Sequence, residues 1–164
     1  FAMKWVEWGV GISSWQLGEE QKVLKMKNGD KEAKIGTIIC IESIYPKFCT
    51  GFTKLGANML TVITNDAWYD HTTGPRQHYL IACMRAIENR RYIARCANSG
   101  VSGIISAAGR SVKEAPQFKR LGFAAEVPLV EGKSIYVRTG DWLLWICTAI
   151  SIIALIISFF VKKK

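Results

Sequence analysis

The sequence has 164 residues, enough for one domain with a sizeable buried core. Its 22 lysines and arginines exceed its 13 acidic residues, so the formal net charge is +9. The basic side chains are dispersed, apart from Arg90-Arg91 and Lys162 to Lys164, and no basic stripe alternates with aromatic residues. This distribution argues against nucleic-acid binding and favours lipid as a partner. The five cysteines are odd in number, and no pair has the close spacing of a zinc knuckle or a redox dithiol. A disulfide framework is not expected in a chain with 49% apolar residues.

The beginning of the chain predicts little regular structure. It opens at Phe1 rather than at a methionine, and nothing at this end resembles a secretory signal. We therefore expect a piece of a longer polypeptide, with part of any active site upstream. The first clear signal is Asn28-Gly29 within residues 25–30, because Asn-Gly tolerates the positive φ values of a hairpin turn.

Strands and helices are then predicted in alternation. Residues 35–40 and 59–64 are short apolar runs rich in β-branched residues, typical of buried strands, and a turn with a helix is expected between them over 43–55. Pro75 suits the first turn of a helix running to about Asn89. Further strands are predicted at 92–96, 101–106 and 122–128. This order indicates an α/β layered domain.

A membrane-spanning helix is predicted at the end of the chain. From Trp142 to Val161 there are twenty residues without a charge, and such a helix spans about 30 Å, the thickness of the hydrocarbon core of a bilayer. A buried core helix is the alternative, but core helices are usually shorter and keep a polar stripe. We expect 1–140 to be the catalytic part and 141–164 the membrane helix. By the positive-inside rule, Lys162 to Lys164 are cytoplasmic and the domain lies on the periplasmic face of a bacterial inner membrane.

Cys40 is the candidate nucleophile. It ends an apolar strand, where a side chain is held rigidly at the rim and the N–H groups of the following turn can face a developing oxyanion. From position alone, a buried core thiol is the more frequent outcome. Glu42 is the nearest acid, but a carboxylate raises the pKa of a neighbouring thiol. We therefore expect Glu42 to orient or hydrogen-bond rather than to act as the base.

Other polar residues carry weaker signals. Asn65, Asp66 and Trp68 follow the second strand, and loops at strand ends often build sites. His71 and His78 are each more often satisfied structural histidines than catalytic ones. A further set at helical spacing is expected to form an ion-paired face: Arg85, Glu88 and Arg91.

Three segments in this order select a family. The segments are IGTIICIES, GANMLTVITNDAWYDHTTGPRQH and MRAIENRRYIARCANSGVSGIISAAGR. Together they resemble the C-terminal half of the carbon–nitrogen hydrolase (nitrilase) superfamily. Within it, NDAWY…GPRQH and the closing YVRTGDW before a membrane helix resemble the apolipoprotein N-acyltransferases. The resemblance covers about residues 35–161 in one register.

The resemblance implies a nitrilase-like αββα sandwich, of which this chain would supply the C-terminal half, followed by one transmembrane helix. It implies transfer of an acyl chain from a phospholipid to the N-terminal amine of a diacylglyceryl-cysteine lipoprotein, with no cofactor or metal. Cys40 matches the nucleophile of a Glu-Lys-Cys triad and Glu42 an accessory residue. The backbone N–H of Ile41 would stabilise the oxyanion. Asn65, Asp66 and Trp68 match a segment bordering the site.

Two departures from the family pattern stand out. Ile41 occupies the place of a tyrosine, which removes a hydroxyl group. The triad glutamate and lysine should precede the matched region, and the early candidates do not sit in the family's motifs: Lys4, Glu7, Glu19 and Glu20. We therefore expect the chain alone to be inactive. Two other readings stay open, a membrane-anchored amidase of the same superfamily and a non-catalytic derivative of the fold.

Overall fold

The computed structural model describes residues 18–161. Its centre is a mixed sheet of six strands whose order in space follows the chain. The strands are β1 (Val23–Asn28), β2 (Lys31–Ile39), β3 (Met59–Asn65), β4 (Ile93–Asn98), β5 (Ser102–Ile105) and β6 (Ser111–Ala115). The helices are α1 (Pro46–Lys54), α2 (Gly74–Asn89), α3 (Ile135–Thr139) and α4 (Trp142–Val161), with short 3-10 helices η2 (Cys40–Ile44) and η3 (Ala67–Tyr69).

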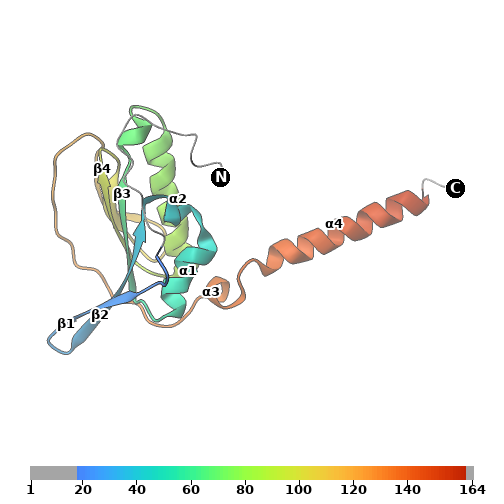
Figure 1. The fold of residues 1–164 in the computed structure, drawn as a ribbon, viewed down its shortest axis with the longest axis horizontal. Coiled ribbons are helices and arrows are strands. Elements are labelled where there is room, and N and C mark those ends of the chain that lie inside the picture. The colour runs from blue at the N-terminus through green and yellow to red at the C-terminus, as the bar shows by residue number, and fades with distance from the viewer. Residues whose placement is uncertain (1–17, 162–164) are drawn as a thin grey trace.

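Strands β2, β3 and β4 are parallel, and α1 and α2 make the two crossovers between them. Both helices lie on one face of the sheet (Figure 1). The core lies between, where inward side chains such as Ile38, Leu60 and Ile93 meet Phe52 and Tyr79 of the helices. Burial of these apolar side chains stabilises the fold by about 1.5–3 kcal/mol each. The β-branched runs that predicted strands are therefore the buried centre of the sheet.

The opposite face of the sheet carries no helix in the part of the chain that the structure describes. Ile39 and Ile63 lie there with about half of their surface accessible, at 51% and 52%. Figure 1 shows the long connection from β6 to α3 running along this side, away from α1 and α2. It contributes Leu121 and Phe123 to a cavity whose floor includes Ile63 and Cys96.

The hairpin prediction is confirmed, since β1 and β2 pair antiparallel with Asn28 opposite Lys31. Gly29 is the first of the two turn residues and has a φ of +60°, which glycine adopts without steric cost. The crossover elements are confirmed as well: η2 and α1 fill the predicted turn and helix, and α2 runs to Asn89.

The strand predicted at residues 122–128 is wrong. These residues have no strand partner. They cross the face of the sheet opposite α1 and α2, where Gly122 and Phe123 border a cavity together with Ile63 and Cys96. The sixth strand is β6 instead, which the sequence analysis missed. Its exposed residues show no apolar alternation, and its pairing with β5 follows from the tight turn at Gly109.

The predicted ion-paired face on α2 is wrong for Arg91. Arg85 and Glu88 do pair, with Nη2 and Oε1 2.9 Å apart. Arg91 is buried instead, and its Nε donates to the carbonyl of Ala57 at 2.7 Å. Its guanidinium also donates to the carbonyl of Gly132, so it ties the β6–α3 connection to the domain.

Helix α4 matches the predicted membrane segment at both ends. The stretch Trp142–Phe160 has a mean hydropathy of 2.6, and none of it is buried against the rest of the chain. Figure 1 shows α4 projecting away from the domain as an isolated rod. A core helix would be covered by its neighbours, so α4 is an apolar helix that could cross a membrane.

Candidate active site

The carboxyl ends of β2, β3 and β4 meet at one edge of the sheet, because these strands are parallel. Cys40 follows β2 directly, Asp66 follows β3, and Asn98 ends β4. Asn65 and Asn98 face each other across the β3–β4 ladder, and the Nδ2 of Asn98 donates to the Oδ1 of Asn65 at 3.0 Å. The sheet topology thus gathers polar groups that are far apart in sequence.

Cys40 has an unusual backbone conformation. Its φ is +48°, in the left-handed region, which costs a non-glycine residue roughly 1–2 kcal/mol. It is the first residue of η2, so the chain turns sharply away from the sheet at this point. The cysteine is half-buried rather than sealed in the core. Strained residues of this kind are concentrated at functional sites. The turn of residues 39–43, which we call the elbow, is therefore the leading candidate for the active site.

The side chain of Glu42 stabilises the turn around Cys40. Its Oε2 accepts a hydrogen bond from the backbone N–H of Ile39 at 2.7 Å, so the carboxylate closes the turn around Cys40. This contact fits an orienting residue better than a base. The N–H groups of Cys40 and Ile41 lie at the start of η2, where a helix leaves its first N–H groups without acceptors of its own.

Behind Cys40 lies a buried polar group that the sequence analysis did not foresee. Ser43 donates from its Oγ to the carbonyl oxygen of Cys40 at 2.8 Å, and the same Oγ lies 2.7 Å from the Nε2 of His78. That Nε2 is also 3.3 Å from the Cys40 carbonyl. Ser43 is fully buried and His78 is 3% exposed, so these contacts are shielded from water.

Asp66 is the centre of this network. Its Oδ1 lies 2.8 Å from the Nδ1 of His78 and accepts from Thr64 at 3.0 Å, while its Oδ2 accepts from the Nη2 of Arg95 at 2.6 Å. Burial opposes ionisation of Asp66, but its hydrogen bond to His78 and the charge of Arg95 outweigh it, so the pKa of Asp66 is lowered. The buried pair is therefore a carboxylate and a guanidinium.

The residues predicted to border the site differ in where their side chains lie. Asp66 points inward to the network, whereas Trp68 is 65% exposed and Asn65 faces Asn98 at the surface. His78 is satisfied, as expected, although its contact with the Cys40 region was not predicted. His71 is exposed and lies near Phe118, with ring centres 4.3 Å apart. Ser43 and Arg95 gave no sequence signal. Ser43 reaches the Cys40 carbonyl through the local turn of η2, whereas Arg95 reaches Asp66 only because the crossover through α2 places β4 beside β3.

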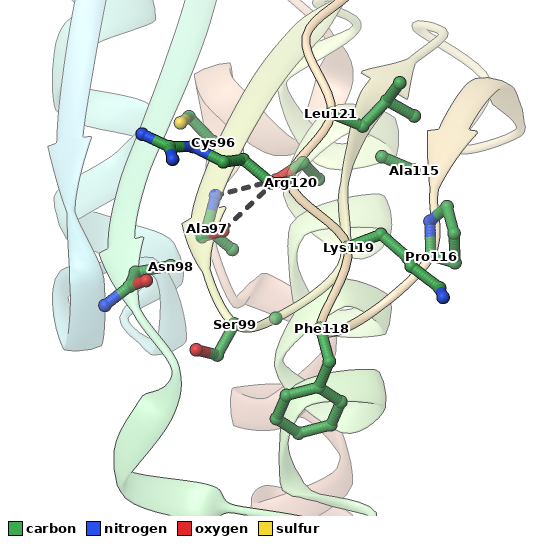
Figure 2. Close-up of a pocket in the computed structure, with 12 residues that line it drawn as sticks. Cys96, Ala97, Asn98, Ser99, Ala115, Pro116, Phe118, Lys119, Arg120 and Leu121 are labelled. Atoms are coloured by element: carbon green, nitrogen blue, oxygen red, sulfur yellow. Dashed lines mark hydrogen bonds between the residues drawn. The ribbon is translucent and has the colours of Figure 1, made fainter.

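A cavity of about 500 Å³ opens at the same end of the sheet. Figure 2 shows it between the end of β4, at Cys96 and Asn98, and the segment that carries Phe118 and Lys119. Gly100 separates this cavity from the buried network, since a Cβ at this position would lie 2.2 Å from the Oδ2 of Asp66. Among residues 18–161 no group of three or more His, Cys, Asp or Glu side chains could hold a metal ion.

The cysteines differ in their surroundings, which predicts a labelling pattern. Burial raises the pKa of Cys49 to about 12 and also raises that of Cys83, so both stay as thiols at the ordinary pH of alkylation. In the folded protein we expect no iodoacetamide adduct on Cys49, which is 0% exposed, and rapid labelling after unfolding in urea. Peptide mass spectrometry before and after urea checks this, and fast labelling of Cys49 in the native state would contradict the packing of α1.

Comparison with known proteins identifies the family. The carbon–nitrogen hydrolase family model matches residues 10–134. The chain belongs to this family. Its mixed sheet is the nitrilase-superfamily fold, as predicted, followed by the apolar helix α4. A Saccharomyces cerevisiae member of branch 10 of the nitrilase superfamily shares the fold, with a TM-score of 0.51 and 24% identity over 62% of this chain and 39% of that one.

Two similar curated sequences come from one group within this family. The chain is 40% identical over 156 residues to an apolipoprotein N-acyltransferase of Chlorobaculum tepidum, covering 94% of this chain and 29% of that protein. It is 35% identical over 139 residues to an apolipoprotein N-acyltransferase of Geobacter metallireducens, covering 85% of this chain and 26% of that protein. The chain therefore spans less than a third of the length of these relatives.

Proposed function

We propose that this chain is the C-terminal part of an enzyme that transfers an acyl chain from a phospholipid to the N-terminal amine of a diacylglyceryl-cysteine lipoprotein. The observation that carries the proposal is the strained, half-buried Cys40 at the strand edge, at the place of the family nucleophile, in a chain 40% identical to an apolipoprotein N-acyltransferase. We assign Cys40 as nucleophile, Glu42 as accessory residue and Ile41 as backbone donor.

In the first half-reaction, the Cys40 thiolate attacks the ester carbonyl of the phospholipid. The developing oxyanion accepts hydrogen bonds from the Ile41 N–H and from the triad lysine, and the lysophospholipid leaves as its alcohol after protonation. A thioester on Cys40 remains. In the second half-reaction, the lipoprotein amine attacks that thioester, forms the amide and releases the thiolate.

The triad glutamate and lysine are assigned to no residue of this chain. Glu19 and Glu20 are exposed, and Glu20 pairs with Lys22 at 2.8 Å. Lys4 and Glu7 lie outside the described residues. The proposal places both triad partners in a preceding segment of the natural gene product, so activity should be tested on that full product.

The membrane arrangement is part of the proposal. Residues 1–140 form the C-terminal part of the catalytic domain, and 141–164 form a transmembrane helix whose lysine tail, outside the described residues, stays in the cytoplasm. The domain then faces the periplasm beside the inner membrane, where a tether raises the local concentration of lipid substrates. Protease added to spheroplasts should cleave the domain, and complete protection would refute this orientation.

Reconstitution separates the transferase from the other two readings. The full gene product is incubated with phospholipid vesicles and a diacylglyceryl-cysteine peptide, and in parallel with small amides. We expect N-acylated peptide and lysophospholipid. Release of ammonia from the amides without N-acyl product would favour an amidase, and absence of both products would favour a non-catalytic derivative.

A further inference from the structure

We propose that the buried chain Arg95–Asp66–His78–Ser43 is a positioning device that grips the carbonyl of Cys40 and fixes the elbow in its left-handed conformation. The inference rests on the proposed function only in taking Cys40 as the nucleophile. It assigns a role to four residues that were not expected to act on the nucleophile. None of them contacts the reacting sulfur in the proposed reaction, so they act through the backbone of Cys40.

The chain of hydrogen bonds runs without a gap. The Nη2 of Arg95 donates to Asp66 at 2.6 Å, Asp66 meets the Nδ1 of His78 at 2.8 Å, and the Nε2 of His78 lies 2.7 Å from Ser43. Ser43 then reaches the Cys40 carbonyl at 2.8 Å. These residues come from β4, the end of β3, α2 and η2. The four residues therefore connect the turn at Cys40 to α2 and to the ends of β3 and β4.

Counting protons assigns a direction to two bonds of this chain. Ionised Asp66 can only accept, so the Nδ1 of His78 carries a proton. Ser43 has one hydroxyl proton, and its geometry gives that proton to the Cys40 carbonyl. The Nε2 of His78 completes the contact to Ser43, with donor and acceptor roles set by the ring tautomer.

The charged groups around His78 fit this arrangement. Asp66 and Arg95, both with fully buried side chains, face it from the strand side, and Arg76 lies on its own helix but is exposed and paired with Glu114. Arg95 keeps a further buried nitrogen, Nη1, without a hydrogen-bond partner among the described residues.

The strained backbone of Cys40 needs surrounding contacts to hold it in place. A cysteine at φ +48° relaxes toward ordinary backbone unless surrounding contacts hold it. Glu42 fixes the N–H of Ile39 on one side of the elbow, and Ser43 fixes the carbonyl of Cys40 on the other. The two contacts together set the direction of the Cys40 side chain and of the N–H groups that follow it.

The test compares two buried hydroxyl deletions in the full gene product. Ser43→Ala removes the grip, and Thr53→Val is the matched control, because Thr53 is equally buried and makes one hydrogen bond, 2.7 Å to Asn89, away from Cys40. The rate of Cys40 alkylation by iodoacetamide is followed in the tryptic peptide 35–47, which contains no other cysteine. Because the assay needs no lipid, its result is independent of whether the enzyme is a transferase.

We expect Ser43→Ala to slow alkylation of Cys40 by about ten- to a hundredfold, the usual effect of a small misplacement of a reacting group. Thr53→Val should leave the rate of Cys40 alkylation unchanged. It should lower the melting temperature by about as much as Ser43→Ala does. In acyl transfer, Ser43→Ala should lower kcat and leave KM for phospholipid unchanged. Ser43→Thr, which keeps the hydroxyl, should restore much of the rate.

The proposal is overturned if Ser43→Ala alkylates as fast as the unchanged protein, or if Thr53→Val slows alkylation equally. Should Ser43→Ala fail to fold, His78→Gln replaces it. Histidine contacts Asp66 and Ser43 through two separate ring nitrogens, and the single amide nitrogen of glutamine cannot bridge both residues in the same way. His78→Gln is expected to slow alkylation, and an unchanged rate would reject the positioning role. Normal alkylation kinetics without any acyl transfer would instead reject the proposed function alone.

Discussion

Replacing Cys40 by alanine should abolish acyl transfer in the full gene product, by about 10⁴-fold or more, as loss of a covalent nucleophile does in other enzymes. The Cys40→Ala variant should stay folded, because alanine at φ +48° has the same left-handed strain as the cysteine that it replaces. The measurement is the initial rate of N-acyl peptide formation, with circular dichroism to monitor folding.

Cys40→Gly provides the sharper control. Glycine adopts a positive φ without steric cost, so this variant should be at least as stable as the natural protein while lacking the sulfur. Cys147→Ala is the matched cysteine control, because Cys147 is exposed and lies on α4, outside the site. Transfer that survives in Cys40→Gly, or that is lost in Cys147→Ala, would contradict the assignment of the nucleophile.

Replacing Arg95 by leucine should cost about 3–5 kcal/mol in the free energy of unfolding, the range measured when one partner of a buried ion pair is removed. Asp66 and Arg95 both have fully buried side chains and lie 2.6 Å apart. Without the guanidinium, the Asp66 carboxylate is left beside His78 with no strong cation. Urea unfolding of the full gene product, followed by tryptophan fluorescence, measures the loss.

The double replacement Asp66→Leu with Arg95→Leu separates charge from packing. A hydrophobic pair of similar volume is often as stable as a buried ion pair, so the double variant should regain part of the loss. It should still react slowly at Cys40, because the positioning chain is gone. A single Arg95→Leu variant as stable as the natural protein would show that the pair contributes little to folding.

The strands at the centre of the sheet could be predicted from sequence because they are buried on at least one face and rich in β-branched residues. Residues 59–64 became β3 with one residue added, whereas the strand predicted at 35–40 became β2, which begins four residues earlier and ends at Ile39. The segment 122–128 is also rich in apolar residues, yet it crosses the face of the sheet and does not pair with an edge strand. Whether an extended segment joins a sheet depends on its partners, which local sequence does not record.

The position of Cys40 at the edge of the sheet could be predicted, and the buried polar residues behind it could not. Cys40 stands out because it directly follows a buried strand, and Asp66 because it follows the next one. Ser43 and His78 are 35 residues apart in sequence, and Arg95 is 29 residues from Asp66, so only the two crossovers bring them together. Burial of Arg95 could not be inferred either, since a guanidinium is normally exposed unless a specific partner compensates its desolvation.

The most direct test of the account is to trap the acyl chain on the enzyme. The full gene product is incubated with phospholipid in the absence of lipoprotein acceptor, quenched in acid and digested with trypsin. The account predicts an acyl thioester on Cys40 in the peptide 35–47, cleaved by hydroxylamine and lost when the diacylglyceryl peptide is added. N-acyl product formed with no acyl group ever found on Cys40, or with the acyl group on another residue, would contradict it.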